Sequence, residues 1–258
     1  MTTRKAVISG ASKGIGYAIA RRLAADGAEV GLLASHEGRL QDAAERIQKE
    51  TDGRVAWHVA DLRTCEGCEE AHGMIAKALG GCDILVNSAG ATKGGLWPEQ
   101  PDEEWEDGFA LKFYSAVRLA RLFWPSLTAA HGTVINIVGG FARTPAADFM
   151  VGGVVNAALA NFSKALAAQG LRDDVNVNWV HPGLTVTERL DQIFEGRAKQ
   201  QGKTRDQVEQ EAIAHEGIRR LGQPEDVAAM VAFLCSEEGR HIHGTAVQID
   251  GGGTPGYY

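Results

Sequence analysis

A glycine-rich turn close to the amino end limits the folds open to this chain more than any other feature. The apolar run Ala6-Val7-Ile8 leads into Ser9-Gly10-Ala11-Ser12-Lys13-Gly14-Ile15-Gly16-Tyr17, where a helical pattern begins. Glycines spaced Gly-x-x-x-Gly-x-Gly allow a tight turn and a close approach of the backbone to a ligand. The free amides and the positive end of the helix would then hold a pyrophosphate. A plain strand-to-helix turn is the alternative, but the position of the glycine motif between a first strand and a first helix favours a dinucleotide site.

Short aliphatic or β-branched runs alternate with longer amphipathic stretches along the whole chain. The expected strands are 6–8, 29–33, 55–59, 84–86, 133–138, 175–180 and 246–249, and the clearest helical patterns are 15–26, 39–50, 102–130, 154–169 and 225–236. Such alternation predicts an α/β fold in which right-handed crossovers join parallel strands. No linker or low-complexity tract interrupts the pattern, so we expect a single domain over residues 1–258. Residues 188–216 are charged and poor in large apolar side chains, which is typical of an inserted lid that contacts the substrate.

Composition and charge exclude several classes of function. The chain has 258 residues, of which 44% are hydrophobic and 23% charged, as in an ordinary globular protein and not a disordered one. A formal net charge of -7 offers no basic field for nucleic acid or an anionic membrane surface. Residues 1–5 are polar, and no apolar run approaches the roughly 18 residues of a membrane span. We therefore expect a cytoplasmic protein with a small-molecule substrate.

The four cysteines could contribute to a metal site, but their spacing favours another interpretation. Cys65-x-x-Cys68 with His72 has the form of half a zinc site. Neither Cys82 nor Cys235 belongs to a second ligand pair at a suitable spacing. We expect reduced thiols on a helix and no bound metal.

Polar and glycine motifs follow the later strands in a recognisable order. Asp61-Leu62 follows the third expected strand, Asn87-Ser88-Ala89-Gly90 the fourth, His181-Pro182-Gly183 the sixth and Asp250-Gly251-Gly252 the last. Together with the glycine turn, these motifs resemble the short-chain dehydrogenase/reductase family over essentially the whole chain. The resemblance implies a Rossmann-type doubly wound parallel sheet of about seven strands with helices on both faces. It also implies a nicotinamide dinucleotide and a homotetramer or homodimer.

The same resemblance implies which residues hold the cofactor. Asp61 and Leu62 would contact the adenine, Asn87 and Gly90 the adenosine ribose region, and residues 182–187 the nicotinamide and phosphates. The full expected set is Gly10, Ser12, Lys13, Gly14, Ile15, Gly16, Ser35, His36, Arg39, Asp61, Leu62, Asn87, Ala89, Gly90, Pro182, Gly183, Thr185 and Thr187.

The choice between NAD(H) and NADP(H) can be argued from charge. An acidic residue at the end of the second strand would accept from a ribose 2′-hydroxyl, but this chain reads Ala34-Ser35-His36 there. Lys13 in the glycine turn, with Ser35, His36 and Arg39, instead offers donors and cations for a 2′-phosphate. NADP(H) is therefore preferred, although Lys13 as a merely solvated surface lysine remains the alternative.

The positions that carry chemistry in the family are filled differently here. By resemblance, the serine that binds the substrate oxygen is replaced by Gly139, the tyrosine that transfers the proton by Gly152, and the lysine four residues later by Asn156. The supporting asparagine on the preceding helix is replaced by Lys112, and no Tyr-x-x-x-Lys occurs in the chain. The motifs for cofactor binding match the family, whereas the positions that transfer the proton differ. This contrast indicates a divergent member with altered or abandoned proton chemistry.

Lysine and asparagine have exchanged places between two helices that lie side by side in this fold. Lys112 belongs to a face at helical spacing that is otherwise apolar, formed by Trp105, Phe109, Ala116, Leu119 and Phe123. Burial would lower the pKa of Lys112 and cofactor oxygens would raise it, so the direction of the net shift stays open. The alternative is a surface lysine whose stem packs inward while its ammonium reaches water.

We expect Lys112, Asn156 and His181 to be the catalytic residues. His181 titrates near working pH and precedes Pro182-Gly183 at the nicotinamide end. Weaker candidates are Asp148, Arg143, Tyr257 and Tyr258. Small residues such as Gly152 on the second helix indicate either a subunit contact or a wider pocket.

These features favour an NADP(H)-dependent oxidoreductase that transfers hydride to or from a carbonyl or imine-type small molecule with an atypical active site. A protonated imine needs only hydride, whereas a ketone reductase without an acid and an oxyanion donor would lose about 10⁴-fold in rate. The alternative is a catalytically inactive nucleotide-binding member of the family, and a lyase or isomerase is a third class.

Overall fold

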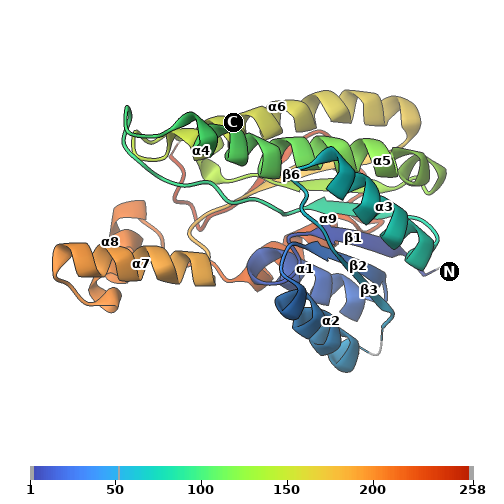
Figure 1. The fold of residues 1–258 in the computed structure, drawn as a ribbon, viewed down its shortest axis with the longest axis horizontal. Coiled ribbons are helices and arrows are strands. Elements are labelled where there is room, and N and C mark those ends of the chain that lie inside the picture. Colours follow the sequence, from blue (N-terminus) through green and yellow to red (C-terminus); the bar gives the residue numbers. More distant parts are fainter. Residues whose placement is uncertain (1–2, 52, 256–258) are drawn as a thin grey trace.

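A seven-stranded parallel sheet forms the centre of the computed structural model, which describes residues 3–51 and 53–255 (Figure 1). The strand order is β3-β2-β1-β4-β5-β6-β7. The strands are β1 (Lys5–Ser9), β2 (Glu29–Ala34), β3 (Val55–Val59), β4 (Ile84–Asn87), β5 (Thr133–Ile137), β6 (Asn176–Pro182) and β7 (Ala246–Ile249). The predicted fold class, a doubly wound Rossmann-type sheet, is confirmed.

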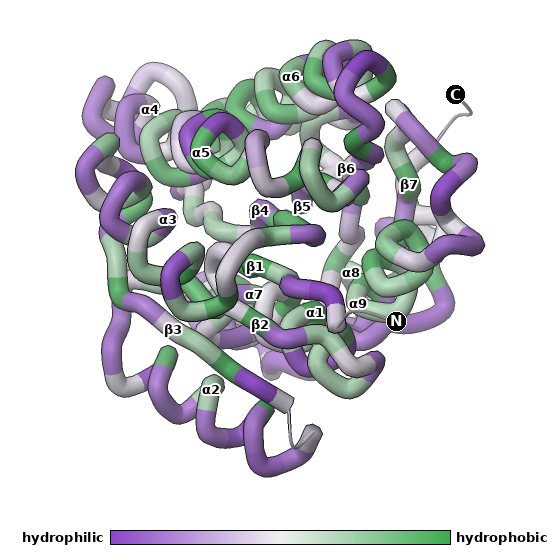
Figure 2. Tube along the Cα trace, turned by 90° about the vertical axis from the view of Figure 1, so that its right-hand side faces the viewer, coloured by the Kyte–Doolittle hydropathy of each residue, from purple (hydrophilic) through white to green (hydrophobic). Residues whose placement is uncertain are grey.

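Helices cover both faces of the sheet because successive strand residues point to opposite sides. The helices are α1 (Gly14–Ala25), α2 (Glu37–Thr51), α3 (Cys65–Leu79), α4 (Asp102–Gly108), α5 (Ser115–Ala129), α6 (Met150–Asp173), α7 (Glu188–Gln201), α8 (Arg205–Glu216) and α9 (Pro224–Leu234). Ala6 and Ile8 pack in a core with α1, α2 and α9, whereas Val7 packs in a second core with α3 and α5. Figure 2 shows hydrophobic and hydrophilic stretches alternating along these helices on either side of the sheet.

The chain reverses its direction of travel across the sheet between β1 and β4, which are neighbours. From β1 it moves outward to β2 and β3, and from β4 it moves the other way to β7. The carboxyl ends of strands at such a switch point leave a crevice in which ligands bind. The fold therefore positions a site beside the loops after β1 and β4.

The helix predicted over residues 102–130 is interrupted, which corrects the sequence-based expectation. Between α4 and α5 the backbone forms a π-helix, Phe109–Tyr114, that contains Lys112. A π-turn holds more residues than an α-turn, but the spacing of apolar residues over so short a stretch does not distinguish the two. The expected inward face persists, since Ala116, Leu119 and Phe123 are buried.

Helices α7 and α8 project from one end of the sheet as a pair (Figure 1). They carry a small apolar core of their own, which includes Leu190, Phe194 and Val208. Thr187 begins α7 by accepting a hydrogen bond from the Leu190 amide at 3.3 Å. Within the described part of the chain, no helix has the length and apolar character needed to cross a membrane.

Candidate active site

The glycine turn forms an anion-binding end at the start of α1. Gly10 and Gly14 have φ angles of +69° and +58°, which favour glycine. A Cβ at Gly16 would lie 2.3 Å from the carbonyl oxygen of Gly10, so the turn closes only with glycine there. Lys13 precedes the helix without a side-chain cap, which leaves the first amides of α1 free to receive a ligand. These residues fit a dinucleotide pyrophosphate.

A cleft of about 1190 Å³ runs along the carboxyl ends of the strands. It brings together most residues of the predicted cofactor set, namely Gly10, Ser12, Lys13, Gly14, Ile15, Gly16, Ser35, Asp61, Leu62, Ala89, Gly90, Pro182, Gly183, Thr185 and Thr187. Lys112 and Asn156 line its other end. His36, Arg39, Asn87 and His181 are not among the described residues that line it.

Two cations lie near the end of β2, at the adenosine end of the cleft, by which we mean the end where the sequence predicts the adenosine of the cofactor. Lys13 lines the cleft there and Arg39 lies beside it. Lys13 Nζ lies 2.5 Å from Glu188 Oε2, and an Arg39 guanidinium nitrogen lies 3.8 Å from the same oxygen. His36 is exposed and its Nδ1 accepts a hydrogen bond from the Arg39 amide at 3.3 Å. Glu188 belongs to α7 and was not singled out from the sequence, because nothing local marks it as a partner of the glycine turn.

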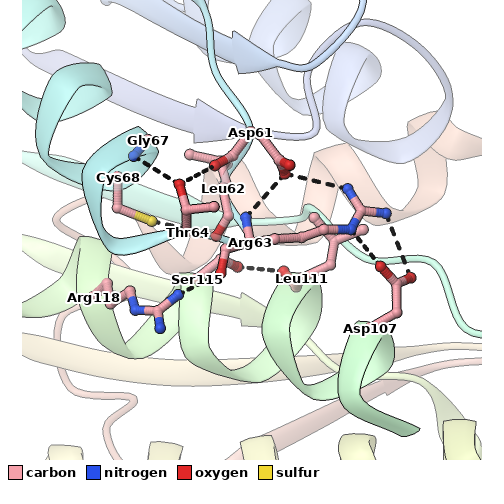
Figure 3. A network of polar contacts seen from close by, with 10 residues as sticks. All are labelled: Asp61, Leu62, Arg63, Thr64, Gly67, Cys68, Asp107, Leu111, Ser115 and Arg118. Atoms are coloured by element: carbon pink, nitrogen blue, oxygen red, sulfur yellow. Dashed lines mark hydrogen bonds and ion pairs between the residues drawn. The ribbon is translucent and has the colours of Figure 1, made fainter. Parts of the chain in front are cut away.

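Through Arg63, Asp61 is linked to α4 and α5, the helices on either side of the π-helix that contains Lys112 (Figure 3). Arg63 donates to Asp61 at 3.3 Å and, through Nε, to Asp107 of α4 at 2.5 Å. Arg118 of α5 donates to the Arg63 carbonyl at 2.7 Å. The loop after β3 is therefore held against α4 and α5 by charged contacts.

Asn87 lies beneath the cleft and not on its surface. It is 3% exposed, and its Nδ2 donates to Asn136 Oδ1 at 2.8 Å, while Asn136 donates to Ser163 at the same distance. Asn87 Oδ1 is buried and has no hydrogen-bond partner among the residues that the structure describes. This geometry makes Asn87 a link between β4, β5 and α6, so direct contact with a ribose, as predicted, does not match its burial.

Lys112 reaches the chemical end of the cleft from the π-helix. Its methylene stem packs on Gly90, where a Cβ would lie 2.9 Å from Cδ of the lysine. Among the described residues, its ammonium has no hydrogen-bond or ion-pair partner. Desolvation, assisted by the like charge of Arg189, lowers the pKa of Lys112 to about 8. The direction of the pKa shift of Lys112, which the sequence left open, is therefore downward in this structure.

Asn156 and His181 hold the Gly139 peptide from two sides. Asn156 Oδ1 accepts from the Gly139 amide at 2.7 Å, and its Nδ2 donates to the Gly152 carbonyl at 2.6 Å. His181 Nδ1 lies 3.3 Å from the Gly139 carbonyl oxygen. His181 is 1% exposed, and burial lowers its pKa. Its imidazole thus faces backbone and does not reach the surface of the cleft.

An aromatic ring fills the space beside Gly152. A Cβ there would lie 1.9 Å from Cε1 of Phe149, so the ring stands where a side chain at residue 152 would begin. Phe149 packs against Phe141 with ring centroids 4.8 Å apart. Phe149 lies in the loop before α6, and no periodic or motif signal in the sequence marks it.

Asp148, one of the weaker catalytic candidates, lines the cleft, whereas Arg143 and the four cysteines do not. All four cysteines are free, and Cys65 and Cys68 lie on α3 as expected. His72 packs against the Phe123 ring. No group of three or more potential metal ligands occurs within residues 3–51 and 53–255. Tyr257 and Tyr258, the weaker candidates in the tail, lie outside the described residues.

Comparison with known proteins gives similarity over nearly the whole chain. The family profile described as Enoyl-(Acyl carrier protein) reductase matches residues 10–254. Nodulation protein G from Rhizobium sp. (strain N33) is 34% identical over 256 residues, which cover 98% of this chain and 97% of that protein.

Two solved structures share the fold and hold a nucleotide. L-Sorbose reductase from Gluconobacter frateurii, complexed with NADPH and L-sorbose, has a TM-score of 0.95 and 34% identity, covering 99% of this chain and 98% of its own. An NADPH-bound short chain oxidoreductase from Pseudomonas aeruginosa PAO1, described as containing an atypical catalytic center, has a TM-score of 0.89 and 25% identity, with 98% of each chain covered.

Proposed function

The chain belongs to the short-chain dehydrogenase/reductase family, and from this premise we propose that it is an NADP(H)-dependent oxidoreductase with an atypical active site. It transfers hydride to or from a carbonyl or imine-type small molecule. The observation that carries the proposal is one continuous cleft, which joins an intact glycine turn to an unpaired, desolvated Lys112. When bound, the nicotinamide supplies or accepts the hydride.

The cofactor is NADP(H). Ala34 ends β2 and Ser35 follows it, so the strand end has no carboxylate that would repel a 2′-phosphate. Lys13 and Arg39 supply positive charge nearby. The likeness to reductases solved with NADPH supports the same choice. Ser12, Gly14 and Ile15 at the start of α1 would hold the pyrophosphate.

Lys112 is the group that handles the proton. An ammonium with a pKa of about 8 is still mostly protonated at pH 7 and donates more readily than an ordinary lysine. Its position at the cleft wall allows contact with a substrate oxygen or nitrogen or with a cofactor hydroxyl. The likeness to an oxidoreductase described as containing an atypical catalytic center supports an atypical active site in this chain.

Asn156 and His181 position this end of the cleft. Both amide atoms of Asn156 are engaged with backbone, at Gly139 and Gly152, and His181 contacts the Gly139 carbonyl. Asn156 therefore shapes the wall at which a substrate would stand, and His181 supports that wall from behind. We assign neither a proton transfer.

A catalytically inactive nucleotide-binding protein is the second candidate. It is favoured by the Phe149 ring, which fills the space at Gly152, and by the absence of a phenol at that place. This alternative predicts NADPH binding without oxidation of the cofactor across a broad panel of carbonyl and imine compounds.

The experiment is to measure NADPH and NADH binding by titration calorimetry and then turnover on that panel. Lys112→Met should lower kcat at least tenfold, because it removes the general acid. The dissociation constant of NADPH should stay nearly unchanged. Lys93→Met is the matched control, because Lys93 also lines the cleft but pairs with Glu104 at 3.2 Å. Unchanged turnover in Lys112→Met would remove Lys112 from the mechanism.

Three further features belong to the same proposal. Helices α7 and α8, within residues 188–216, act as a substrate lid: Arg189 at the start of α7 crosses the cleft and donates to the Thr92 carbonyl at 2.6 Å. The protein is a cytoplasmic homotetramer or homodimer. Light scattering after size-exclusion chromatography tests the oligomer, for which exposed Val154 and Leu171 on α6 offer apolar surface.

A further inference from the structure

A carboxylate from α7 lies between the two cations of the adenosine end. Glu188 Oε2 is 2.5 Å from Lys13 Nζ and 3.8 Å from an Arg39 guanidinium nitrogen. Contact with Lys13 and the charge of Arg39 keep the pKa of Glu188 below its ordinary value, so the group is anionic at neutral pH. The same oxygen thus lies within ion-pair distance of both side chains to which the 2′-phosphate is assigned, and the carboxylate offsets one of their two positive charges.

The three residues come from parts of the chain that only the fold brings together. Lys13 precedes α1, Arg39 lies in the first turn of α2, and Glu188 is the first residue of α7. All three side chains are about half exposed, so an anionic ligand can reach the cations without unfolding any element.

The start of α7 also contacts the opposite wall of the cleft. Arg189 Nη2 donates to the Thr92 carbonyl at 2.6 Å, in the loop that follows β4. Adjacent residues of α7 therefore reach both walls, with Glu188 on the adenosine side and Arg189 on the chemical side. A nucleotide that enters the cleft meets both contacts.

We propose that Glu188 occupies the place of the adenosine 2′-phosphate in the ligand-free protein and competes with it, and that this residue thereby sets how strongly NADP(H) is preferred over NAD(H). The inference rests on the proposed binding of NADP(H) at Lys13 and Arg39. A phosphate carries more negative charge and more acceptor oxygens than a carboxylate, so it displaces Glu188 from the cations. NAD(H) has no group that competes for them and leaves Glu188 in contact with Lys13.

The test is calorimetric titration with two pairs of ligands that differ by the 2′-phosphate. These are adenosine 2′,5′-bisphosphate against adenosine 5′-monophosphate, and NADPH against NADH. Glu188→Gln should bind the 2′-phosphorylated member of each pair about two- to fivefold more tightly, the range for an exposed ion pair, with the other member unchanged. The gain should disappear at about 0.5 M salt, because exposed charges are screened there.

Glu195→Gln is the matched control, because Glu195 is an exposed carboxylate on the same helix that does not line the cleft. It should leave all four affinities unchanged. In a Lys13→Met background, Glu188→Gln should give a smaller gain, since one of the two cations is gone.

Two results would overturn the inference while the proposed function stands. One is a Glu188→Gln variant that binds NADPH no more tightly than the unmodified protein. The other is an equal gain for NADPH and NADH, which would indicate a general loosening of α7. Failure of the unmodified protein to bind either dinucleotide would overturn the proposed function and the inference together.

Discussion

One added methyl group at Gly152 should destabilise the protein, although alanine is the better helix former. Its Cβ would lie 1.9, 2.3 and 2.5 Å from three ring carbons of Phe149, so the ring has to move. Overpacking of this kind costs about 1–3 kcal/mol. Replacing a helical glycine with alanine returns roughly 0.5–1 kcal/mol. The net effect of Gly152→Ala is a loss of about 1 kcal/mol in the free energy of unfolding.

The sign should reverse when the ring is removed. Phe149→Ala alone loses the contact with Phe141 and lowers stability by about 1 kcal/mol. In that background no ring opposes the new methyl group, so Gly152→Ala should raise stability by roughly 0.5–1 kcal/mol. The two positions are therefore coupled by about 2 kcal/mol, a size that a double-mutant cycle resolves.

Urea unfolding, followed by circular dichroism at one fixed protein concentration, measures all four proteins of the cycle. Gly73→Ala on α3 is the control, because a Cβ there meets nothing within 4 Å. It should stabilise both backgrounds by a similar amount. If Gly152→Ala stabilised the unmodified protein as Gly73→Ala does, Phe149 could not occupy the space beside Gly152.

Four other predictions concern Lys112, the glycine turn and the buried amides. The pKa of Lys112 in the folded protein, about 8, lies below its ordinary value of 10.5, so the unfolded chain binds more protons than the folded one between these two pH values. The free energy of unfolding should therefore rise as the pH increases from about 8 to 10.5. Lys112→Met should flatten this rise when urea midpoints are measured across the pH range. The carbonyl-reducing rate should fall as pH increases through about 8, and Arg189→Met, which removes a like charge, should move this inflection upward in a kcat/KM profile. Gly16→Ala should weaken NADPH binding about tenfold or more in calorimetry, because the new Cβ would lie 2.3 Å from the Gly10 carbonyl oxygen and the turn has to shift. A tenfold loss of affinity corresponds to about 1.4 kcal/mol. Asn136→Ala should lower the free energy of unfolding by about 1–3 kcal/mol, since it leaves Asn87 Nδ2 without its buried acceptor, while Ser163 loses one donor but still donates to the Leu159 carbonyl. A loss no larger than that of an alanine substitution at an exposed position would contradict this network.

The sheet and the cofactor cleft could be predicted because their signals are local. Gly10, Gly14 and Gly16 have to be glycine for the backbone to close, and aliphatic runs separated by amphipathic stretches leave few alternatives to a parallel sheet. The preference for NADP(H) followed from one strand end and one lysine, and it agrees with the NADPH complexes of similar proteins.

Features that leave no motif or periodic pattern in the sequence could not be predicted. Glu188 meets Lys13 across 175 residues of chain, which only the fold brings together. The ring of Phe149 beside Gly152 and the π-helix around Lys112 are local features, but neither alters the apolar periodicity of the sequence. For His181 and Asn87 the sequence indicated the position along the chain but not the depth of burial. Their motifs were found, but burial behind the cleft wall depends on the neighbouring strands.

The contacts around Gly139 and Gly152 have a consequence for how such a sequence can change over generations. A side chain at Gly139 would meet Asn156 Nδ2 at 3.0 Å, and one at Gly152 would meet the Phe149 ring. A larger residue at either place therefore requires its neighbour to move or to be replaced by a smaller one. Each glycine and its neighbour thus tolerate paired substitutions better than single ones, because the single change passes through a less stable protein.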